Sequence, residues 1–447
     1  MVPYFHTETL VRKPPVNVAI ATVAARSDVH PRGLFVLAVT EIWERFSYYG
    51  MRALLVFYMT KHLLMGQAES SQVYGLYTAA VWLTPFFGGL LADRVLGQHR
   101  AVVIGGTLMA IGHFLLAFEA AFFVALGAIA LGNGLFKPNV STQVGDLYPP
   151  GDPRRDRGYG LFYMGMNFGA FIAPLGCGTV GELYGWHWGF GLAGVGMVAG
   201  LAIYIGGMRW LPPDRLLSPP VPAATRGDGH TLSAPRRILG LVAVSLAAAL
   251  FWTVFEQQGN VIALWADGYT DRAVDIGGLH ATIPASWFPG LNGFFIVALT
   301  PAIVGFWRRQ SLRGSEPRIL HKMAIGASLG AASYGVLCLA ALHQQQVAAV
   351  SWLWLVAYFG VLTAGEIYLS PTCLSLFNRA APARHASTLL GVWYGSLFIG
   401  SFLAGYTGTY WQRVPRPAYF AAMAAIAAFS ALSLLLVSRT LGRRLDR

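Results

Sequence analysis

One stretch of the sequence, Glu41 to Arg52, places four ionisable side chains inside a run that is otherwise apolar enough to cross a membrane. They are two acids, Glu41 and Glu44, and two bases, Arg45 and Arg52. A charged residue at the centre of a helix opposes membrane insertion by about 2.5 to 3.5 kcal/mol, whereas a residue such as Leu favours insertion by only about 0.3 to 0.6 kcal/mol. Carboxylates held near guanidinium groups in such a place can take up and release protons.

On an α-helix with about 100° per residue, a wedge of roughly 140° contains six side chains, namely Glu41, Glu44, Arg45, Tyr48, Tyr49 and Arg52. The opposite side, with Trp43 and Leu54, is apolar. We therefore expect the wedge to face partners or water inside a helix bundle. A buried salt bridge with a purely structural role is the alternative interpretation.

Three more charged residues, Lys137, Glu256 and Glu366, lie in other apolar runs. All seven groups, if ionised, sum to one negative charge, which one bound proton would neutralise. A substrate that carries both charges could also be held between the acids and the bases. Pro138 follows Lys137, so we expect a kink that aims the lysine inward. A lysine that extends toward the membrane surface is the alternative.

The composition predicts an all-α polytopic membrane protein. The chain has 447 residues, of which 55% are hydrophobic and only 12% are charged, and its mean hydropathy is +0.52. These values lie far outside the usage of soluble globular proteins. Windows of about 20 apolar residues predict twelve spans, at residues 34–59, 73–92, 101–119, 121–145, 158–180, 188–208, 238–266, 290–307, 321–342, 350–375, 386–408 and 418–439.

The formal charge of +12 has a topological explanation. Under this assignment most of the 32 Lys and Arg residues fall on the side shared by both chain ends. Those on the opposite side are Lys61, Arg272, Arg413 and Arg416. By the positive-inside rule both termini are expected in the cytoplasm, and nucleic acid is not an expected partner.

The cysteines and the N-terminal residues give little information about function. Cys177, Cys338 and Cys373 lie in three different spans, so they are interpreted as core residues rather than as a disulfide or metal set. The apolar patch from Val16 to Ala25 is too interrupted for a signal peptide.

A polar segment at residues 209–237, rich in proline, divides the predicted spans six and six. The predicted organisation is a cytoplasmic N-terminal segment, a first six-helix bundle, a cytoplasmic linker, a second six-helix bundle and a cytoplasmic tail, at residues 1–33, 34–208, 209–237, 238–441 and 442–447.

Several short motifs recur, and each match pairs a span with the span six places later. Leu83-Thr84-Pro85 returns as Leu299-Thr300-Pro301, and Lys137-Pro138 corresponds to Ser370-Pro371. Glu256 is the possible counterpart of Glu44. This pattern predicts two parallel repeats with a cavity between them.

Together these stretches resemble the proton-dependent oligopeptide transporter (POT or PTR, peptide transporter) family of the major facilitator superfamily. Residues 41–50 reproduce the family pattern Glu-x-x-Glu-Arg-Phe-x-Tyr-Tyr-Gly in full. Residues 89–100 resemble the cytoplasmic loop motif of the superfamily. Further resemblance comes from Gly145-Asp146-Leu147-Tyr148, Phe162-Tyr163-Met164-Gly165-Met166-Asn167, Phe251-Trp252-Thr253-Val254-Phe255-Glu256-Gln257, and Glu366 with Ser370-Pro371.

The resemblance implies a major facilitator fold with 12 transmembrane helices in two six-helix bundles around a central cavity. It implies proton-coupled symport of di- and tripeptides into the cytoplasm by alternating access, not catalysis. A proton gradient would drive the cycle without any cofactor or metal. The expected setting is a bacterial-type cytoplasmic (inner) membrane, with the lipid bilayer, protons and small peptides as partners and a monomeric state.

The resemblance also implies residue roles. Arg52 and Lys137 would hold the peptide carboxylate, and Glu366 would meet the amino terminus with help from Asn167 and Asn292. Proton-coupling residues would be Glu41, Glu44, Arg45 and Glu256. Side-chain pockets would be lined by Tyr48, Tyr49, Tyr163, Trp82, Trp252 and Trp393. Two gates would be formed by the pairs Arg52 with Glu256 and Lys137 with Glu366. From the residues alone, asparagines that join helices and tryptophans that pack remain alternatives.

The chain departs from the family in three places. Bacterial members commonly carry two extra helices between the halves, for which residues 209–237 are too short and too polar. Trp82 stands where the family more often has tyrosine, and Gln257 leaves a single carboxylate at Glu256.

Other functions remain open from the sequence. The same fold could carry nitrate, a drug or an amino-acid-like compound with proton coupling. A passive channel would also suit the apolar spans. A membrane enzyme is disfavoured, because the sequence shows no metal-ligand cluster, nucleophile elbow or phosphate-binding glycine loop.

Overall fold

The structure is a computed structural model that describes residues 29–149, 152–214, 216, 234–380 and 386–442. The predicted N-terminal segment, linker and C-terminal tail lie largely outside these residues. The first half of the chain contains α1 (Arg32–Phe57), α2 (Gln67–Leu91), α3 (Gln98–Leu115), α4 (Phe122–Asp146), α5 (Arg154–Ala173), α6 (Thr179–Tyr184) and α7 (Trp186–Gly207). The second half contains α8 (Ala234–Phe255), α9 (Val261–Gly268), α10 (Gly290–Leu312), α11 (Ile319–Gln344), α12 (Leu353–Ala380), α13 (Ala386–Gly408) and α14 (Arg416–Val437).

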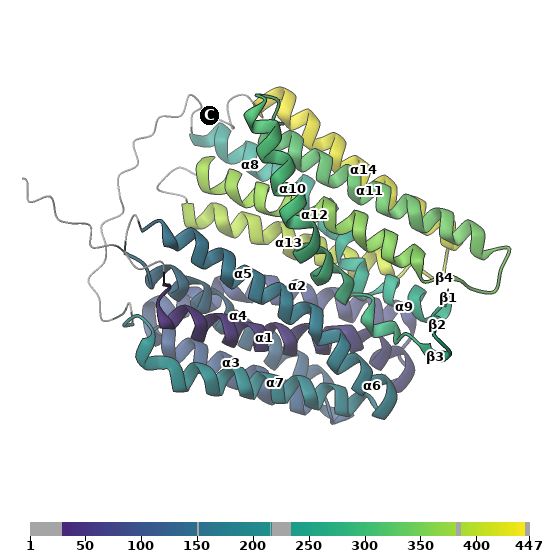
Figure 1. Cartoon of the computed structure of the whole chain (residues 1–447), viewed down its shortest axis with the longest axis horizontal. Helices are drawn as coiled ribbons and strands as arrows, with labels where there is room; N and C mark the ends of the chain where they lie inside the picture. Colours follow the sequence, from purple (N-terminus) through teal and green to yellow (C-terminus); the bar gives the residue numbers. More distant parts are fainter. Residues whose placement is uncertain (1–28, 150–151, 215, 217–233, 381–385, 443–447) are drawn as a thin grey trace, which may run out of the picture.

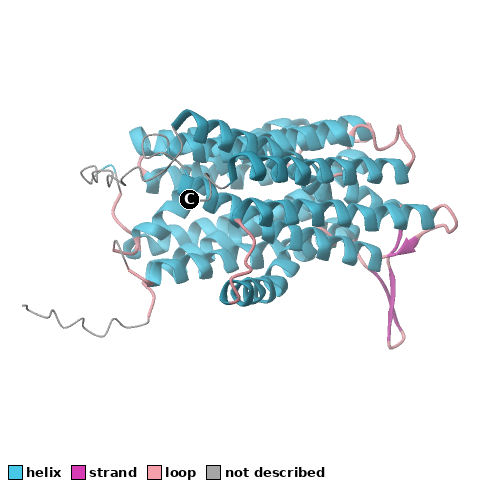
Figure 2. Cartoon of the chain, turned by 90° about the horizontal axis from the view of Figure 1, so that it is seen from above, coloured by secondary structure: helices cyan, strands magenta, loops and turns pink. Residues whose placement is uncertain are grey.

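Strands are confined to one end of the molecule. β2 (Ala273–Ile276) and β3 (Leu279–Thr282) form an antiparallel hairpin, and β1 (Thr270–Asp271) pairs in parallel with β4 (Val350–Ser351). Figure 2 shows the hairpin extending away from the helices. α1 begins at the end opposite to the strands (Figure 1). We call the end that carries the strands the outer end of the bundle.

The helices pack as two groups that touch along their common side. Within the first half α1 packs on α5 and α7, and α4 packs on α2 and α3. Within the second half α11 packs on α12 and α14, and α8 packs on α13 and α14. Between the halves α2 packs on α13 and α5 packs on α10. Figure 1 shows the first half, which begins in purple, below the second half, which runs from teal at α8 to yellow at α14.

The described helices are those of a polytopic membrane protein. Twelve of them have 18 residues or more, which agrees with the number of predicted spans. Within the described part of the chain, nine segments are long and apolar enough to cross a membrane, judged by length and composition. α1 is not among them, because it carries Glu41, Glu44, Arg45 and Arg52. Fully buried Leu54, Leu55 and Val56 show that the apolar part of α1 packs inside the bundle.

Two predicted spans are interrupted. The span predicted at residues 158–180 is α5 followed by the π-helical segment η4 (Pro174–Gly178) and α6. Pro174 cannot donate a backbone hydrogen bond, so the regular pattern ends there. The span predicted at 238–266 breaks at the 3-10 segment η7 (Glu256–Gly259), where Asn260 leaves helical geometry with φ −115° and ψ −101°. Both breaks lie beside the central cavity.

The two halves repeat the same helix contacts. A Cβ added to Gly132 of α4 would lie 2.5 Å from the carbonyl oxygen of Gly105 in α3, and one added to Gly365 of α12 would lie 2.6 Å from that of Gly326 in α11. Pro138 lies six residues after Gly132 in α4, and Pro371 lies six residues after Gly365 in α12. This register supports the correspondence of Lys137 with Ser370 that the sequence motifs indicate.

Candidate functional site

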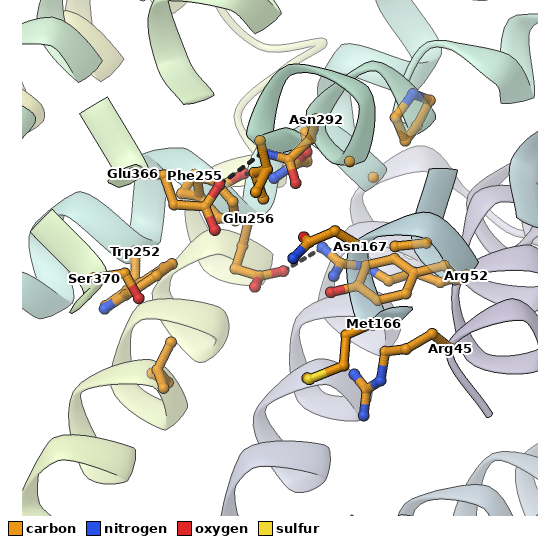
Figure 3. Close-up of a pocket in the computed structure, with 18 of the residues that line it drawn as sticks. Arg45, Arg52, Met166, Asn167, Trp252, Phe255, Glu256, Asn292, Glu366 and Ser370 are labelled. Carbon is orange, nitrogen blue, oxygen red and sulfur yellow. Dashed lines mark hydrogen bonds and ion pairs between the residues drawn. The ribbon is translucent and has the colours of Figure 1, made fainter. Parts of the chain in front are cut away.

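A cavity of about 250 Å³ lies between the two halves. Its walls come from α1, α2, α4 and α5 on one side and from α8, η7, α10, α12 and α13 on the other. The charged residues that line it are Arg45, Arg52, Lys137, Glu256 and Glu366. Figure 3 shows Arg45, Arg52, Met166 and Asn167 facing the acids Glu256 and Glu366 across this space.

Arg52 joins the two halves at the outer side of the cavity. Its Nη2 lies 2.5 Å from Oε2 of Glu256, and its Nε donates to the hydroxyl of Tyr74 at 2.7 Å. Both members of the ion pair are almost fully buried, with side-chain exposures of 8% and 2%. The guanidinium also lies over the ring of Tyr49, at 5.8 Å from its centroid. A buried pair of this kind depends on both partners, since either charge alone would be costly to bury.

Arg45 forms a second buried ionic cluster, about two turns before Arg52 on α1. Its Nε lies 3.1 Å from Oε1 of Glu41 and 2.5 Å from Oε2 of Glu44. Asn133 of α4 donates to Oε1 of Glu44 at 3.2 Å. Both carboxylates have no exposed surface, whereas Arg45 reaches the cavity wall. The acids are therefore connected to the cavity through the arginine.

Lys137 and Glu366 both line the cavity but are not paired with each other. The Nζ of Lys137 lies 4.0 Å from the ring centroid of Trp82. Oε2 of Glu366 accepts a hydrogen bond of 2.7 Å from Asn292, which also donates to Thr363 at 3.1 Å. Among the described residues no salt bridge within 4.0 Å includes either charge. The cavity thus presents a cation and a carboxylate from opposite halves.

Aromatic rings form much of the remaining wall. Trp82 stacks on Tyr394 with centroids 6.4 Å apart, and Trp252 meets Trp393 edge to face at 6.0 Å. The indole N–H of Trp252 is buried without a hydrogen-bond partner in the described structure. Asn167 also lines the cavity, and its side chain donates to the backbone oxygen of residue 163 at 2.8 Å.

The structure brings most of the predicted site residues together. The cavity wall contains Arg45, Tyr49, Arg52, Trp82, Lys137, Tyr163, Asn167, Trp252, Glu256, Asn292, Glu366 and Trp393. Glu41 and Glu44 lie behind it, in contact with Arg45.

Tyr48, expected in the wall, does not line the cavity in this structure. Its ring is 3% exposed and packs edge to face on Tyr49, at 5.2 Å between centroids. Successive residues of an α-helix are rotated by about 100° about its axis, so the side chains of Tyr48 and Tyr49 point in different directions. Tyr49 therefore takes the wall position while Tyr48 packs in the first bundle.

Tyr394 and Gln258 also line the cavity, although no sequence pattern points to them. Tyr394 directly follows the expected pocket residue Trp393, and Gln258 directly follows the motif residue Gln257. Neither has a charge or a motif position that would single it out in the sequence. Only the stacking of Tyr394 on Trp82 reveals its place in the wall.

Polar contacts close the outer end between the halves. Gln67 of α2 donates to the backbone oxygen of Gly408 in α13 at 3.0 Å and to Ser71 at 2.8 Å. Ser71 in turn donates to Asn260 at 2.9 Å. These bonds lie on the same side of the cavity as the pair of Arg52 and Glu256. The two halves are therefore held together above the cavity.

Comparison with known proteins gives a consistent match over most of the chain. A family model described as PTR2, POT family, matches residues 99–222 and 230–422. The peptide transporter YePEPT of Yersinia enterocolitica is 34% identical, over 85% of this chain and 88% of that protein. A di-/tripeptide transporter of Lactococcus lactis is 34% identical, over 81% of this chain and 86% of that protein. The crystal structure of a peptide transporter POT in complex with sulfate aligns with a TM-score of 0.85 and 32% identity, over 94% of this chain and 96% of that chain.

Proposed function

Because this chain belongs to the POT family of membrane transporters, we propose that it carries di- and tripeptides across a membrane by symport with protons. The relatives named as peptide and di-/tripeptide transporters support the substrate class. The cavity supports it independently, since a peptide with free ends is a zwitterion and the wall offers both charges.

One observation carries the proposal: Lys137 and Glu366 face the same cavity from opposite halves without pairing with each other. A lysine ammonium is a movable point charge for a carboxylate. Glu366, oriented by Asn292 at 2.7 Å, is placed to accept hydrogen bonds from a peptide ammonium. Arg52 can assist with the carboxylate through its planar, bidentate donors. A bound peptide would thereby connect the two halves.

The aromatic residues and amides would set selectivity. Tyr49, Tyr163, Trp82, Trp252 and Trp393 form the apolar wall against which peptide side chains would pack. Asn167 lies on the first half of the cavity and Asn292 on the second. Large rings with few fixed polar atoms accept many side chains, which suits a transporter of broad peptide range.

Proton coupling would use the buried carboxylates. Glu41 and Glu44 share Arg45, and Glu256 pairs with Arg52. Protonation of Glu256 would remove its attraction to Arg52 and release a contact between the halves. A proton gradient would therefore drive the halves apart at the outer end without a cofactor.

Two charge pairs would act as alternating gates. The pair of Arg52 and Glu256 is formed in this conformation, whereas Lys137 and Glu366 are apart. We infer that this conformation is closed at the outer end. Formation of the second pair would close the cavity at the other end when the halves rock.

The distribution of basic residues supports the orientation. Both termini would lie in the cytoplasm, and the outer end would face away from it. The chain would reside in a bacterial-type cytoplasmic membrane. It would act as a monomer, because the proposed gates and cavity are complete within one chain. Residues 34–208 and 238–441 would move as the two halves, joined by a cytoplasmic linker at 209–237.

Uptake into liposomes tests the proposal. Purified protein should accumulate a labelled dipeptide when an inward proton gradient is imposed, and an ionophore that dissipates the gradient should abolish accumulation. No peptide accumulation by folded protein would refute peptide symport. Competition by tripeptides, amino acids and nitrate would then identify a different solute if one is carried.

Two sets of variants separate the roles. Glu366→Gln should weaken binding of peptides with a free amino terminus more than binding of N-acetylated peptides. Equal affinity of variant and wild type would remove Glu366 from the binding site. Glu41→Gln and Glu44→Gln should impair proton-driven uptake more than peptide counterflow, whereas equal loss in both assays would assign these acids to folding or binding.

A further inference from the structure

Three metal-ligating side chains meet at the outer end of the first half, away from the cavity. They are His62, Glu119 and His187, whose ligand atoms lie within 4.8 Å of one another. His62 ends the π-helical segment η1 (Tyr58–His62), Glu119 begins the 3-10 segment η3 (Glu119–Ala121), and His187 lies in the first turn of α7. We propose that these residues form a binding site for a divalent transition-metal ion, with Zn²⁺ as its occupant.

The donor set fits Zn²⁺. Two imidazoles and one carboxylate are a ligand combination that zinc accepts while it keeps a fourth position for water. Ca²⁺ and Mg²⁺ prefer sites made of oxygen ligands and would not compete. Tetrahedral zinc with bonds of about 2.0 to 2.1 Å separates its ligand atoms by about 3.3 Å. The observed grouping reaches this geometry through small side-chain rotations, since Nε2 of His62 already lies 2.8 Å from Oε1 of Glu119.

The surroundings position the ligands and leave them available. The ring of Tyr58 stacks on that of His62, with centroids 5.0 Å apart and 18° between the planes. The rings of His62 and His187 meet edge to face at 4.9 Å. Nδ1 of His187 is buried without a hydrogen-bond partner in the described structure. No described residue therefore hydrogen-bonds Nδ1 of His187, and this nitrogen can offer a lone pair to the ion.

The site is open to solvent at its rim. The side chains of His62 and Glu119 are 30% and 62% exposed, so an ion can enter and a water molecule can complete its shell. Charge favours the ion as well, because two neutral imidazoles and one carboxylate leave a net negative group. The cationic neighbour, Lys61, is directed away and pairs with Asp267 of the second half at 2.7 Å.

A bound ion would join the ends of three helical segments that the sequence places far apart. His62 and Glu119 are separated by 57 positions, which is why sequence spacing predicted no metal ligands. The site belongs to one half alone, but η1 also carries Lys61, which reaches the other half. An ion at His62 would therefore hold one side of the contact between the halves without entering the cavity.

Metal titration of the purified full-length chain tests the proposal. The protein must carry no polyhistidine tag, because a tag would bind the ion itself. Isothermal titration with Zn²⁺ should show one site that His62→Ala, His187→Ala and Glu119→Gln each weaken at least tenfold. The matched control is His280→Ala, because His280 lies on the exposed β2–β3 hairpin beside Asp275. This control should bind Zn²⁺ like the wild type.

A measurement on the wild type alone keeps the test independent of variant folding. X-ray absorption of the Zn²⁺-loaded protein should show two imidazole nitrogens and oxygen ligands, with no sulfur. Wild-type protein that binds no Zn²⁺, cluster variants that bind it unchanged, or a first shell without imidazole would each overturn the assignment. None of these results depends on peptide transport, so the site and the proposed function fail separately.

Discussion

A glycine contact between the halves allows a direct test of the outer closure. A Cβ added at Gly75 of α2 would collide with the backbone Cα of Gly405 in α13 and lie 3.0 Å from the backbone oxygen of Ser401. Backbone atoms cannot turn aside as a flexible side chain can. The two helices must therefore separate if residue 75 carries a branched side chain.

Gly75→Val should consequently destabilise the conformation seen here. Overpacking of a tight contact costs about 1 to 3 kcal/mol, which corresponds to a shift of about 5- to 150-fold in the equilibrium between two conformations. The variant should fold, since the clash disappears once the halves open at the outer end. Proton-driven peptide uptake should fall, because the transport cycle requires both conformations.

Distances between spin labels measure the shift directly. Labels at Leu64 and Gln346, both exposed at the outer end, should report longer separations in Gly75→Val than in the parent chain, in a background without native cysteines. The matched control is Gly335→Val in α11, where an added Cβ would meet nothing within 4 Å. An unchanged distance distribution in Gly75→Val, or the same change in the control, would refute the closure argument.

Three further predictions follow from individual contacts. A double-mutant cycle with Trp82→Ala and Lys137→Gln should show a coupling of about 0.5 to 2 kcal/mol in the free energy of unfolding. The reason is that the ammonium of Lys137 lies 4.0 Å from the ring centroid of Trp82. Additive effects of the two substitutions would contradict this contact. Tyr48→Phe should leave the Kd for dipeptides unchanged in a binding titration, because the ring of Tyr48 lies outside the cavity wall. A clear loss of affinity would show that Tyr48 contributes to peptide binding. Glu316→Gln, in the connection between α10 and α11, should change stability by less than about 1 kcal/mol. The hydrogen bond from Lys322 holds the pKa of Glu316 below its ordinary value of 4.5, so this small contribution is present at neutral pH, is lost as the pH falls through the lowered pKa, and should vanish from thermal melts in acid.

The positions of the helices could be predicted because they follow from local composition. A span must satisfy its backbone internally and present apolar side chains over the thickness of the bilayer. Both requirements are visible in one window of sequence. The span predicted at 386–408 coincides with α13, and the one predicted at 321–342 differs from α11 by two residues at each end. The break at Pro174 is also local, because proline cannot donate a backbone hydrogen bond. The break at Asn260 has no comparable local mark in the sequence.

For the charged stretch of α1, helical geometry alone does not predict which residues each side chain contacts. A helical wheel places its polar residues in one wedge but assigns no neighbour to any of them. The structure divides the wedge into two stripes. Arg45, Tyr49 and Arg52 reach the cavity, whereas Glu44 turns to Asn133 of α4 and Tyr48 packs within the bundle. The division depends on where α4 lies, which is a property of the fold.

By itself the sequence determined the apolar spans, the repeat of motifs six spans apart and the family of the chain, because each is written in residue types and local spacing. Tertiary structure decided which charges meet. Arg52 and Glu256, separated by 204 positions, form a pair only after two helix bundles dock. His62, Glu119 and His187 converge through the packing of helical segments within the first half alone. Electrostatic contacts act over a few ångströms in space, and only the packing of the helices sets those distances.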